Sequence, residues 1–218
     1  MKTNRTELVW ILDRSGSMRG LESDTIGGYN AMLEQQKREP GIATVTTVLF
    51  DDRFELLHDR VDLQQVTPIT DREYYVRGCT ALLDAIGMTI RRIVTAQRTA
   101  APAQRADRVL FVITTDGHEN ASREYTYEQV RRMVQHEQEV YGWEFLFLGA
   151  NIDAIRTAHS FGIPSDRSVN YHADPAGTRL NYEVVSDAVC SMRRGAPLDA
   201  MWKVRIEEDF RTRQPTRR

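Results

Sequence analysis

Cysteine is scarce in this sequence, and long apolar runs are absent from it. Its 218 residues include two cysteines, Cys79 and Cys190, which are too few for a disulfide framework or a thiolate zinc site. The first seven residues are polar and do not form the apolar core of a signal peptide. No segment reaches the roughly 18 consecutive apolar residues that span a bilayer. We therefore expect a reduced, cytoplasmic and soluble protein without a membrane partner.

An excess of charge of one sign is also lacking. The chain has 29 Lys and Arg against 31 Asp and Glu, for a formal net charge of -2. This balance creates no overall field that would attract nucleic acid or an anionic membrane. With 41% hydrophobic residues, a chain of this length can bury the core of one domain. We predict that domain over residues 1–194, without a prediction of oligomeric state. A partly disordered C-terminal arm is expected over 195–218, in which 201–206 forms an edge strand or a docked arm and the polar, basic stretch 211–218 is disordered.

The common signatures of nucleotide-binding and hydrolytic enzymes are missing. There is no phosphate-binding Gly-x-x-x-x-Gly-Lys-Ser/Thr loop and no Gly-x-Ser-x-Gly nucleophile elbow. No dinucleotide fingerprint follows the first apolar segment. A dehalogenase-type phosphatase needs a second Asp where this chain has Ser15, and a receiver domain needs an acidic cluster that the amino terminus lacks. We therefore expect a protein that is not an enzyme. Metal-assisted hydrolysis is the weaker alternative, because no positioned general base stands out.

Strand-like and helix-like segments alternate along the chain. Strands are expected at 8–12, 44–50, 54–61, 108–115, 143–149 and 168–171, and helices at 25–37, 127–141, 151–161 and 177–194, with a further long helix that follows Thr80 and is broken at 100–103. The three-residue link between 44–50 and 54–61 favours an antiparallel hairpin, because a parallel crossover needs about a dozen residues. The pattern predicts a Rossmann-like, doubly wound α/β fold. Its mostly parallel central sheet has one antiparallel edge strand and helices on both faces.

Oxygen-bearing side chains follow the ends of the buried segments. The first apolar run leads directly into Asp13, Ser15 and Ser17, Thr80 precedes the long second helix, and Asp116 follows the run 108–115. In open α/β sheets, ligands sit beyond the carboxyl ends of the strands where strand order reverses. Oxygen donors converging there suit a hard divalent cation. We predict Mg²⁺, with Mn²⁺ or Ca²⁺ as alternatives. The plainer alternatives are turn or cap roles for the two aspartates and an N-cap role for Thr80.

In this order, the three segments resemble the von Willebrand factor A domain with its metal-ion-dependent adhesion site. That family carries Asp-x-Ser-x-Ser after the first strand, a Thr before a central helix and an Asp after the fourth strand. Asp13, Ser15 and Ser17 match the first part, Thr80 matches the second and Asp116 the third. The resemblance covers roughly residues 6–194 and is to the intracellular, bacterial type of domain. It implies that the hydroxyls bind the metal directly and the carboxylates bind directly or through water.

This ligand set predicts a binding function. Neutral hydroxyl ligands leave the positive charge of the cation largely uncompensated, so a carboxylate from another molecule can complete the shell. We expect a metal-dependent binding module for a protein partner with an exposed Asp or Glu. The alternative is a scaffold or regulatory subunit of a larger complex, in which the metal is structural.

Several polar residues near the predicted site have two interpretations. His118 and Glu119 are solvated loop residues, or Glu119 tunes the charge near the ion. Asn30 and Asn151 hydrogen-bond the metal loops, or they serve as ordinary caps and turns. Asp84 is expected to be exposed or to make a helix contact.

Overall fold

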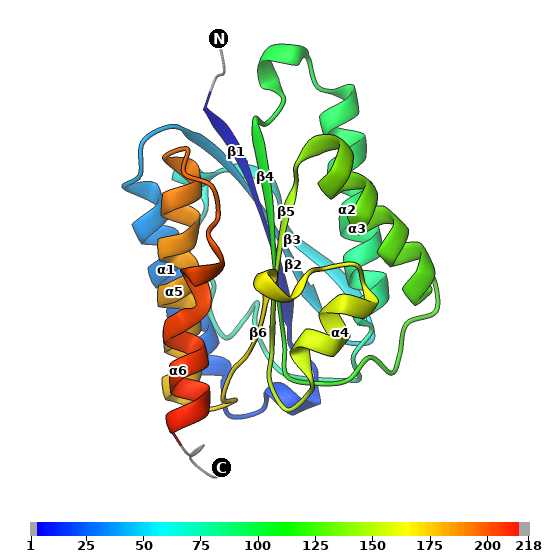
Figure 1. Ribbon diagram of the computed structural model, residues 1–218, viewed down its shortest axis with the longest axis vertical. Coiled ribbons are helices and arrows are strands. Elements are labelled where there is room, and N and C mark those ends of the chain that lie inside the picture. The colour runs from blue at the N-terminus through cyan, green and yellow to red at the C-terminus, as the bar shows by residue number, and fades with distance from the viewer. Residues whose placement is uncertain (1–3, 214–218) are drawn as a thin grey trace.

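A six-stranded sheet lies between two layers of helices in the computed structural model, which describes residues 4–213 (Figure 1). The strands are β1 (Arg5–Asp13), β2 (Ile42–Phe50), β3 (Phe54–Asp62), β4 (Arg108–Thr115), β5 (Glu144–Gly149) and β6 (Ser168–Asn170), and the helices are α1 (Glu22–Lys37), α2 (Leu82–Thr99), α3 (Tyr127–Tyr141), α4 (Ala154–Ser160), α5 (Pro175–Arg193) and α6 (Val204–Thr212). The strand order is β3-β2-β1-β4-β5-β6. Neighbouring strands are parallel except β2 and β3. The predicted fold class and its antiparallel edge strand are confirmed.

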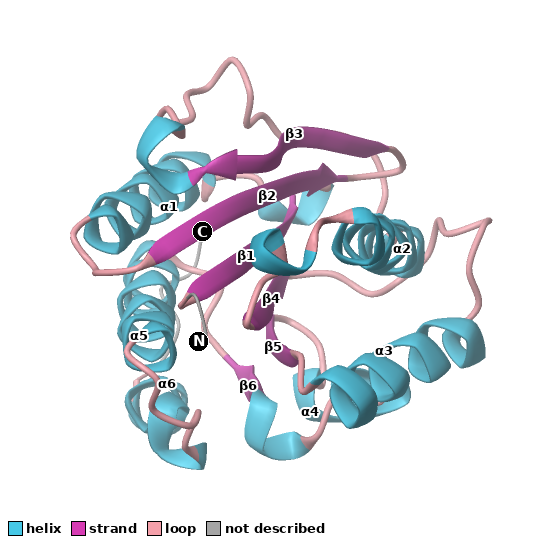
Figure 2. Ribbon diagram, turned by 90° about the horizontal axis from the view of Figure 1, so that it is seen from above, coloured by secondary structure: helices cyan, strands magenta, loops and turns pink. Residues whose placement is uncertain are grey.

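The sheet separates two apolar cores. Helices α1, α5 and α6 cover one face, and α2, α3 and α4 cover the other (Figure 2). Because side chains alternate along a strand, Leu8, Trp10 and Leu12 of β1 enter the first core, while Val9 and Ile11 enter the second. Strands buried on both faces need continuous apolar runs, which is what β1 and β4 have. None of the helices within residues 4–213 is long and apolar enough to cross a membrane.

Strand order reverses between β1 and β4. From β1 the chain builds outward through β2 and β3, returns through α2 to β4, and then builds in the opposite direction through β5 and β6. The carboxyl ends of β1 and β4 are therefore adjacent, and the loops that follow them meet at one rim of the sheet. Asp13 and Asp116 belong to this rim.

Three helices have bounds different from those the sequence predicts, and α5 differs least, because it begins at Pro175 after the cap Asp174 rather than at residue 177. Helix α1 begins at Glu22, so Ser23 and Asp24 lie in its first turn, and its N-cap is Leu21, which makes no side-chain cap. Leu21 is fully buried, so core packing determines where α1 begins. Helix α4 is shorter than predicted, because Asn151 adopts a left-handed φ of 55° and Asp153 provides the cap.

The C-terminal arm is helical where it is described. The alternative of an edge strand over 201–206 is wrong, because a 3-10 turn (Ala200–Lys203) leads into α6. Helix α6 packs against α5 and β6 and buries Ile206. Arg213, in the stretch 211–218 predicted to be disordered, instead forms ion pairs with Asp174 and Asp209. The remainder of that stretch, 214–218, lies outside the described residues.

Candidate metal site

The loop after β1 folds around the carboxylate of Asp13. Asp13 is fully buried, and its Oδ1 accepts a hydrogen bond of 2.6 Å from the backbone N–H of Ser15. A 3-10 turn (Gly16–Met18) follows, and it brings the hydroxyls of Ser15 and Ser17 to 3.1 Å from each other. Ser15 is buried and Ser17 is exposed. The loop therefore places one hydroxyl inside the rim and one at the surface.

Thr80 joins these hydroxyls from a distant part of the chain. Its Oγ1 lies 3.1 Å from the Oγ of Ser15 and donates to it. The loops are also joined through their backbones, since the N–H of Gly16 donates to the carbonyl of Gly78 over 3.1 Å. The N-cap of α2 is Ala81 without a side-chain cap. The N-cap alternative for Thr80 is therefore wrong.

The loop after β4 closes the site from the third side. Asp116 is 2% exposed, and its carboxylate acts electrostatically on that of Asp13. A Cβ placed on Gly117 would lie 3.1 Å from the Oγ of Ser17 and 3.2 Å from the Oγ1 of Thr80. A glycine at 117 thus leaves free the small space that the hydroxyls border. All five predicted ligands are brought together, and their binding of a metal stays a prediction.

Thr115 and Tyr74 take part in the site and were missed by the sequence reasoning. Thr115 donates from Oγ1 to Oδ2 of Asp13 over 2.5 Å, and the Tyr74 hydroxyl donates to the backbone carbonyl of Asp13 over 2.5 Å. Thr114 pairs with Leu12 in the β1–β4 register, so Thr115 stands opposite Asp13. Thr115 could have been identified from the register of β1 and β4, but a single sequence does not give the register of two strands.

Burial raises the pKa of Asp13 to about 6. Hydrogen bonds from Ser15 and Thr115 oppose this shift, and the nearby carboxylate of Asp116 adds to it. A positive charge placed between the two carboxylates would offset both the cost of ionising a buried carboxylate and the repulsion between Asp13 and Asp116. Among the described residues, no group of three or more His, Cys, Asp or Glu forms a metal cluster. The donors are two carboxylates and three hydroxyls, a set that fits a hard cation such as Mg²⁺.

Two acidic residues beside the rim have structural roles. Glu119 accepts hydrogen bonds from the backbone N–H groups of Leu83, Ala121 and Ser122. Asp84 accepts from the backbone N–H groups of Arg123, Glu124 and Tyr125. Together they fasten segment 119–125 to the start of α2. This favours the structural interpretation of Glu119 and the helix-contact interpretation of Asp84.

The other flanking residues lie outside the hydroxyl cluster. Asn30 bonds the backbone N–H and carbonyl of Ile69 and so anchors the segment after β3. His118 and Asn151 are exposed. Cys79, the exposed neighbour of Thr80, is a free cysteine.

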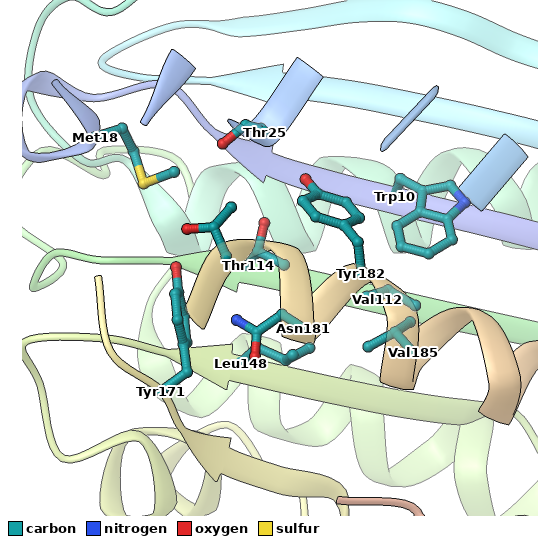
Figure 3. A pocket seen from close by; sticks show the side chains of 11 residues that line it. Trp10, Met18, Thr25, Val112, Thr114, Leu148, Tyr171, Asn181, Tyr182 and Val185 are labelled. Atoms are coloured by element: carbon teal, nitrogen blue, oxygen red, sulfur yellow. The ribbon is translucent and has the colours of Figure 1, made fainter. Parts of the chain in front are cut away.

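A small cavity lies between the sheet and α5, next to the loop after β1. Met18, Thr114, Tyr171 and Asn181 are among the side chains around it (Figure 3). Its other lining groups are also apolar, hydroxyl or amide groups, with no carboxylate, imidazole or thiol among them. The cavity therefore belongs to the packing between the sheet and α5 and supplies no further metal ligand.

Comparison with known proteins supports the fold. No family model and no curated protein matches the chain. Among solved structures, it resembles a von Willebrand factor type A protein from Catenulispora acidiphila, with a TM-score of 0.59, 16% identity and coverage of 86% of this chain and 43% of the other. The ArnB paralog VWA2 from Sulfolobus acidocaldarius gives a TM-score of 0.53 at 16% identity, with coverage of 86% and 45%.

A third similar structure is proximal thread matrix protein 1 from the mussel byssus, solved with a zinc-occupied metal-ion-dependent adhesion site. It gives a TM-score of 0.58 at 14% identity, with coverage of 85% of this chain and 46% of the other. The chain thus spans less than half the length of these solved chains. At these identities the likeness shows the fold alone. The chain has the fold of a von Willebrand factor A domain, as its motifs predict.

Proposed function

We propose that this protein is a metal-dependent protein-binding module that captures a carboxylate of its partner at the rim of the sheet. The observation that carries the proposal is the meeting of Ser15, Ser17 and Thr80 hydroxyls beside the buried carboxylates of Asp13 and Asp116. These residues would hold Mg²⁺, or Mn²⁺ or Ca²⁺ in its place. The adhesion-type site in the mussel protein, which takes zinc, supports a divalent cation here.

The exposure of the site fits capture of a partner. Gly16 and Ser17 lie at the surface, whereas Asp13, Ser15 and Asp116 are buried. When bound, the cation supplies positive charge that neutral hydroxyls do not cancel, and a partner's Asp or Glu is the natural complement at the open side. The balanced charge of the chain supports a protein partner rather than nucleic acid or a membrane surface.

The proposed role is binding without catalysis, in the cytoplasm. Two acidic groups at the rim already have a structural or ligand role: Asp13 is held by Ser15 and Thr115, and Glu119 fastens the loop after β4. A general base requires a group that reaches substrate in a suitable protonation state. Metal-assisted hydrolysis therefore has less support than binding.

Metal titration combined with partner capture tests this function. Calorimetry should detect one Mn²⁺ or Mg²⁺ site in the wild type and none in Asp13→Ala. Partners retained from lysate in Mg²⁺ should elute with EDTA and should not be retained by Thr80→Ala. Thr95→Ala is the matched control, because Thr95 is an exposed threonine of α2 whose hydroxyl donates to the carbonyl of Arg91 in the same helix.

Three outcomes would contradict the proposal in different ways. Equal heats from wild type and Asp13→Ala would remove the site. Metal binding with a partner retained in EDTA would favour the scaffold alternative, in which the metal is structural. Metal-dependent hydrolysis of a phosphoester or peptide, lost in Thr80→Ala, would favour an enzyme.

A further inference from the structure

Arg14, the second residue of the Asp-x-Ser-x-Ser motif, is fully buried. Arginine is almost never buried without partners, and here each end of the guanidinium has one. Nε donates to Oδ2 of Asp51 over 2.9 Å, and the terminal nitrogens donate to Oε2 of Glu55 over 2.6 Å and to the carbonyl of Glu73 over 3.3 Å. These partners are not members of the hydroxyl cluster, and a guanidinium has donors without acceptors, so Arg14 is no metal ligand.

Asp51 receives a second arginine from the loop that carries Thr80. Arg77 donates from Nε to the same Oδ2 over 2.7 Å. Asp51 is fully buried, and its backbone carbonyl accepts from the N–H of Ala81 over 2.8 Å. Asp51, which directly follows β2, is therefore bonded both to Arg14, the neighbour of Ser15, and to Ala81, the neighbour of Thr80.

Backbone bonds and an aromatic ring complete this connection. The N–H of Arg77 donates to the carbonyl of Arg14 over 2.9 Å, and the N–H of Arg14 donates to the carbonyl of Phe50 over 2.8 Å. The Tyr75 ring centroid lies 5.1 Å from the guanidinium carbon of Arg14 and 5.3 Å from that of Arg77. Both guanidinium groups are thus fixed by the same ring and the same carboxylate.

Such a buried charged network is poorly explained by stability alone. Apolar side chains of similar volume often stabilise a core as well as a buried ion pair does. Planar guanidinium groups instead fix geometry, because their donors form a rigid fork. Fixed geometry matters at this rim, since weak neutral hydroxyl donors bind a cation only where they are held in place.

We propose that Arg14, Asp51 and Arg77 form a positioning network that holds the hydroxyls of Ser15 and Thr80 in metal-binding geometry. This inference rests on the proposed metal site. The network joins the loop after β1 to the loop before α2, and these two loops supply three of the five ligands. Without it, the loop that carries Thr80 keeps its backbone bonds but loses the side-chain connection to β2.

The test compares two surface arginines for their effect on metal affinity. Arg77 has a one-third exposed side chain, so Arg77→Gln is expected to fold. Its Kd for Mn²⁺, measured by calorimetry, should rise about 10–100-fold, the usual effect of removing an outer-shell partner. Its melting temperature in EDTA should fall only slightly, because Asp51 keeps its ion pair with Arg14. Arg92→Gln is the matched control, because it removes another Arg–Asp pair, between Arg92 of α2 and Asp59 of β3. Its Mn²⁺ affinity should equal that of the wild type.

Two further variants separate positioning from packing. Arg77→Lys keeps the charge but not the guanidinium fork, so its affinity should fall between wild type and Arg77→Gln. Arg14→Met should weaken Mn²⁺ binding more than Arg77→Gln. If Arg14→Met fails to fold, Arg77→Gln and Arg77→Lys decide the matter.

The outcomes distinguish this inference from the proposed function. If the wild type binds no Mn²⁺, both fall together. If the wild type binds Mn²⁺ and Arg77→Gln binds it equally, the network positions nothing while the proposed function stands. A fall in melting temperature in EDTA that accounts for the whole loss of affinity would make the role structural and overturn the inference.

Discussion

At the residue scale, one added carbon atom on Gly117 would fill part of the candidate site. Its missing side chain leaves open the space beside the Ser17 and Thr80 hydroxyls, where a Cβ would lie at 3.1 and 3.2 Å. Gly117→Ala should therefore weaken Mn²⁺ binding by about tenfold or more while the fold remains, because the hydroxyls must shift by a few tenths of an ångström. Calorimetry and thermal melting in EDTA measure the two effects.

Gly27 provides the control for that substitution. A Cβ on Gly27, in α1, would meet nothing within 4 Å. Gly27→Ala should leave metal affinity unchanged and stabilise the protein by about 0.5–1 kcal/mol, because alanine suits a helix interior better than glycine. Equal Mn²⁺ affinities for the two alanine variants would mean that the space at Gly117 is not used.

Asp13 links protonation to folding in the metal-free protein. Its pKa is raised from 3.8 to about 6 by burial, so between these values the folded state binds more protons than the unfolded state. The free energy of unfolding must then fall as pH rises through that window. The stability that protonated Asp13 gives the folded state is fully present only below about pH 4. A shift of this size corresponds to about 3 kcal/mol.

The difference between wild type and Asp13→Asn isolates this effect. In EDTA, the wild type should lose stability relative to Asp13→Asn as pH rises from 4 to 7, in chemical denaturation at each pH. At pH 7, saturating Mg²⁺ should raise the free energy of unfolding of the wild type but not that of Asp13→Asn. Parallel stability curves in EDTA would show that Asp13 titrates normally in the folded state.

At the scale of elements, the end of the sheet opposite the rim depends on a buried carboxylate in β1. Glu7 is fully buried and accepts from the hydroxyls of Thr44 and Thr46 in β2 and from Nε of Arg60 in β3, over 2.8, 3.1 and 2.8 Å. Arg60 lies at an irregularity of the edge strand, with a φ of 52°. One carboxylate thus ties the three strands on this side of the sheet together.

Arg60→Met should therefore destabilise the fold without affecting the rim. We expect a loss of about 2 kcal/mol, less than for a fully buried pair because Arg60 is a quarter exposed. Adding Glu7→Gln should recover part of the lost stability, since it removes the buried negative charge that Arg60→Met leaves without its ion-pair partner. Urea denaturation measures both effects, and an unchanged Mn²⁺ affinity is the control. No loss in Arg60→Met would mean that the hydroxyls of β2 satisfy Glu7 alone.

The elements that the sequence predicts well are those whose local pattern and burial agree. The apolar runs of β1 and β4 define strands buried on both faces, and parallel topology then brings Asp13 and Asp116 to one rim. The start of α1 and the helical character of α6 were not predictable, because both depend on packing against distant elements. The roles of Thr115 and Arg14 were also inaccessible, since they depend on strand register and on the path of the loop before Thr80.

At the scale of the whole molecule, the two apolar cores should hold the fold without any metal. Each face of the sheet buries its own large cluster of side chains, with β1 contributing to both. A chain of this size differs from small domains that fold only with a bound ion. Circular dichroism in excess EDTA should therefore retain the helical signal. Collapse of that signal would mean that the rim is needed for folding.

Metal should nevertheless raise the melting temperature by mass action. A ligand at 100 times its Kd stabilises the folded state by about 2.7 kcal/mol, so the wild type should melt several degrees higher in saturating Mg²⁺ than in EDTA. Thr80→Ala should keep the EDTA melting temperature, because its hydroxyl donates to the hydroxyl of Ser15 rather than to the backbone, but should gain much less from Mg²⁺. An equal gain in both proteins would place the stabilising ion elsewhere. The rim would then be a structural feature of the fold rather than its binding site.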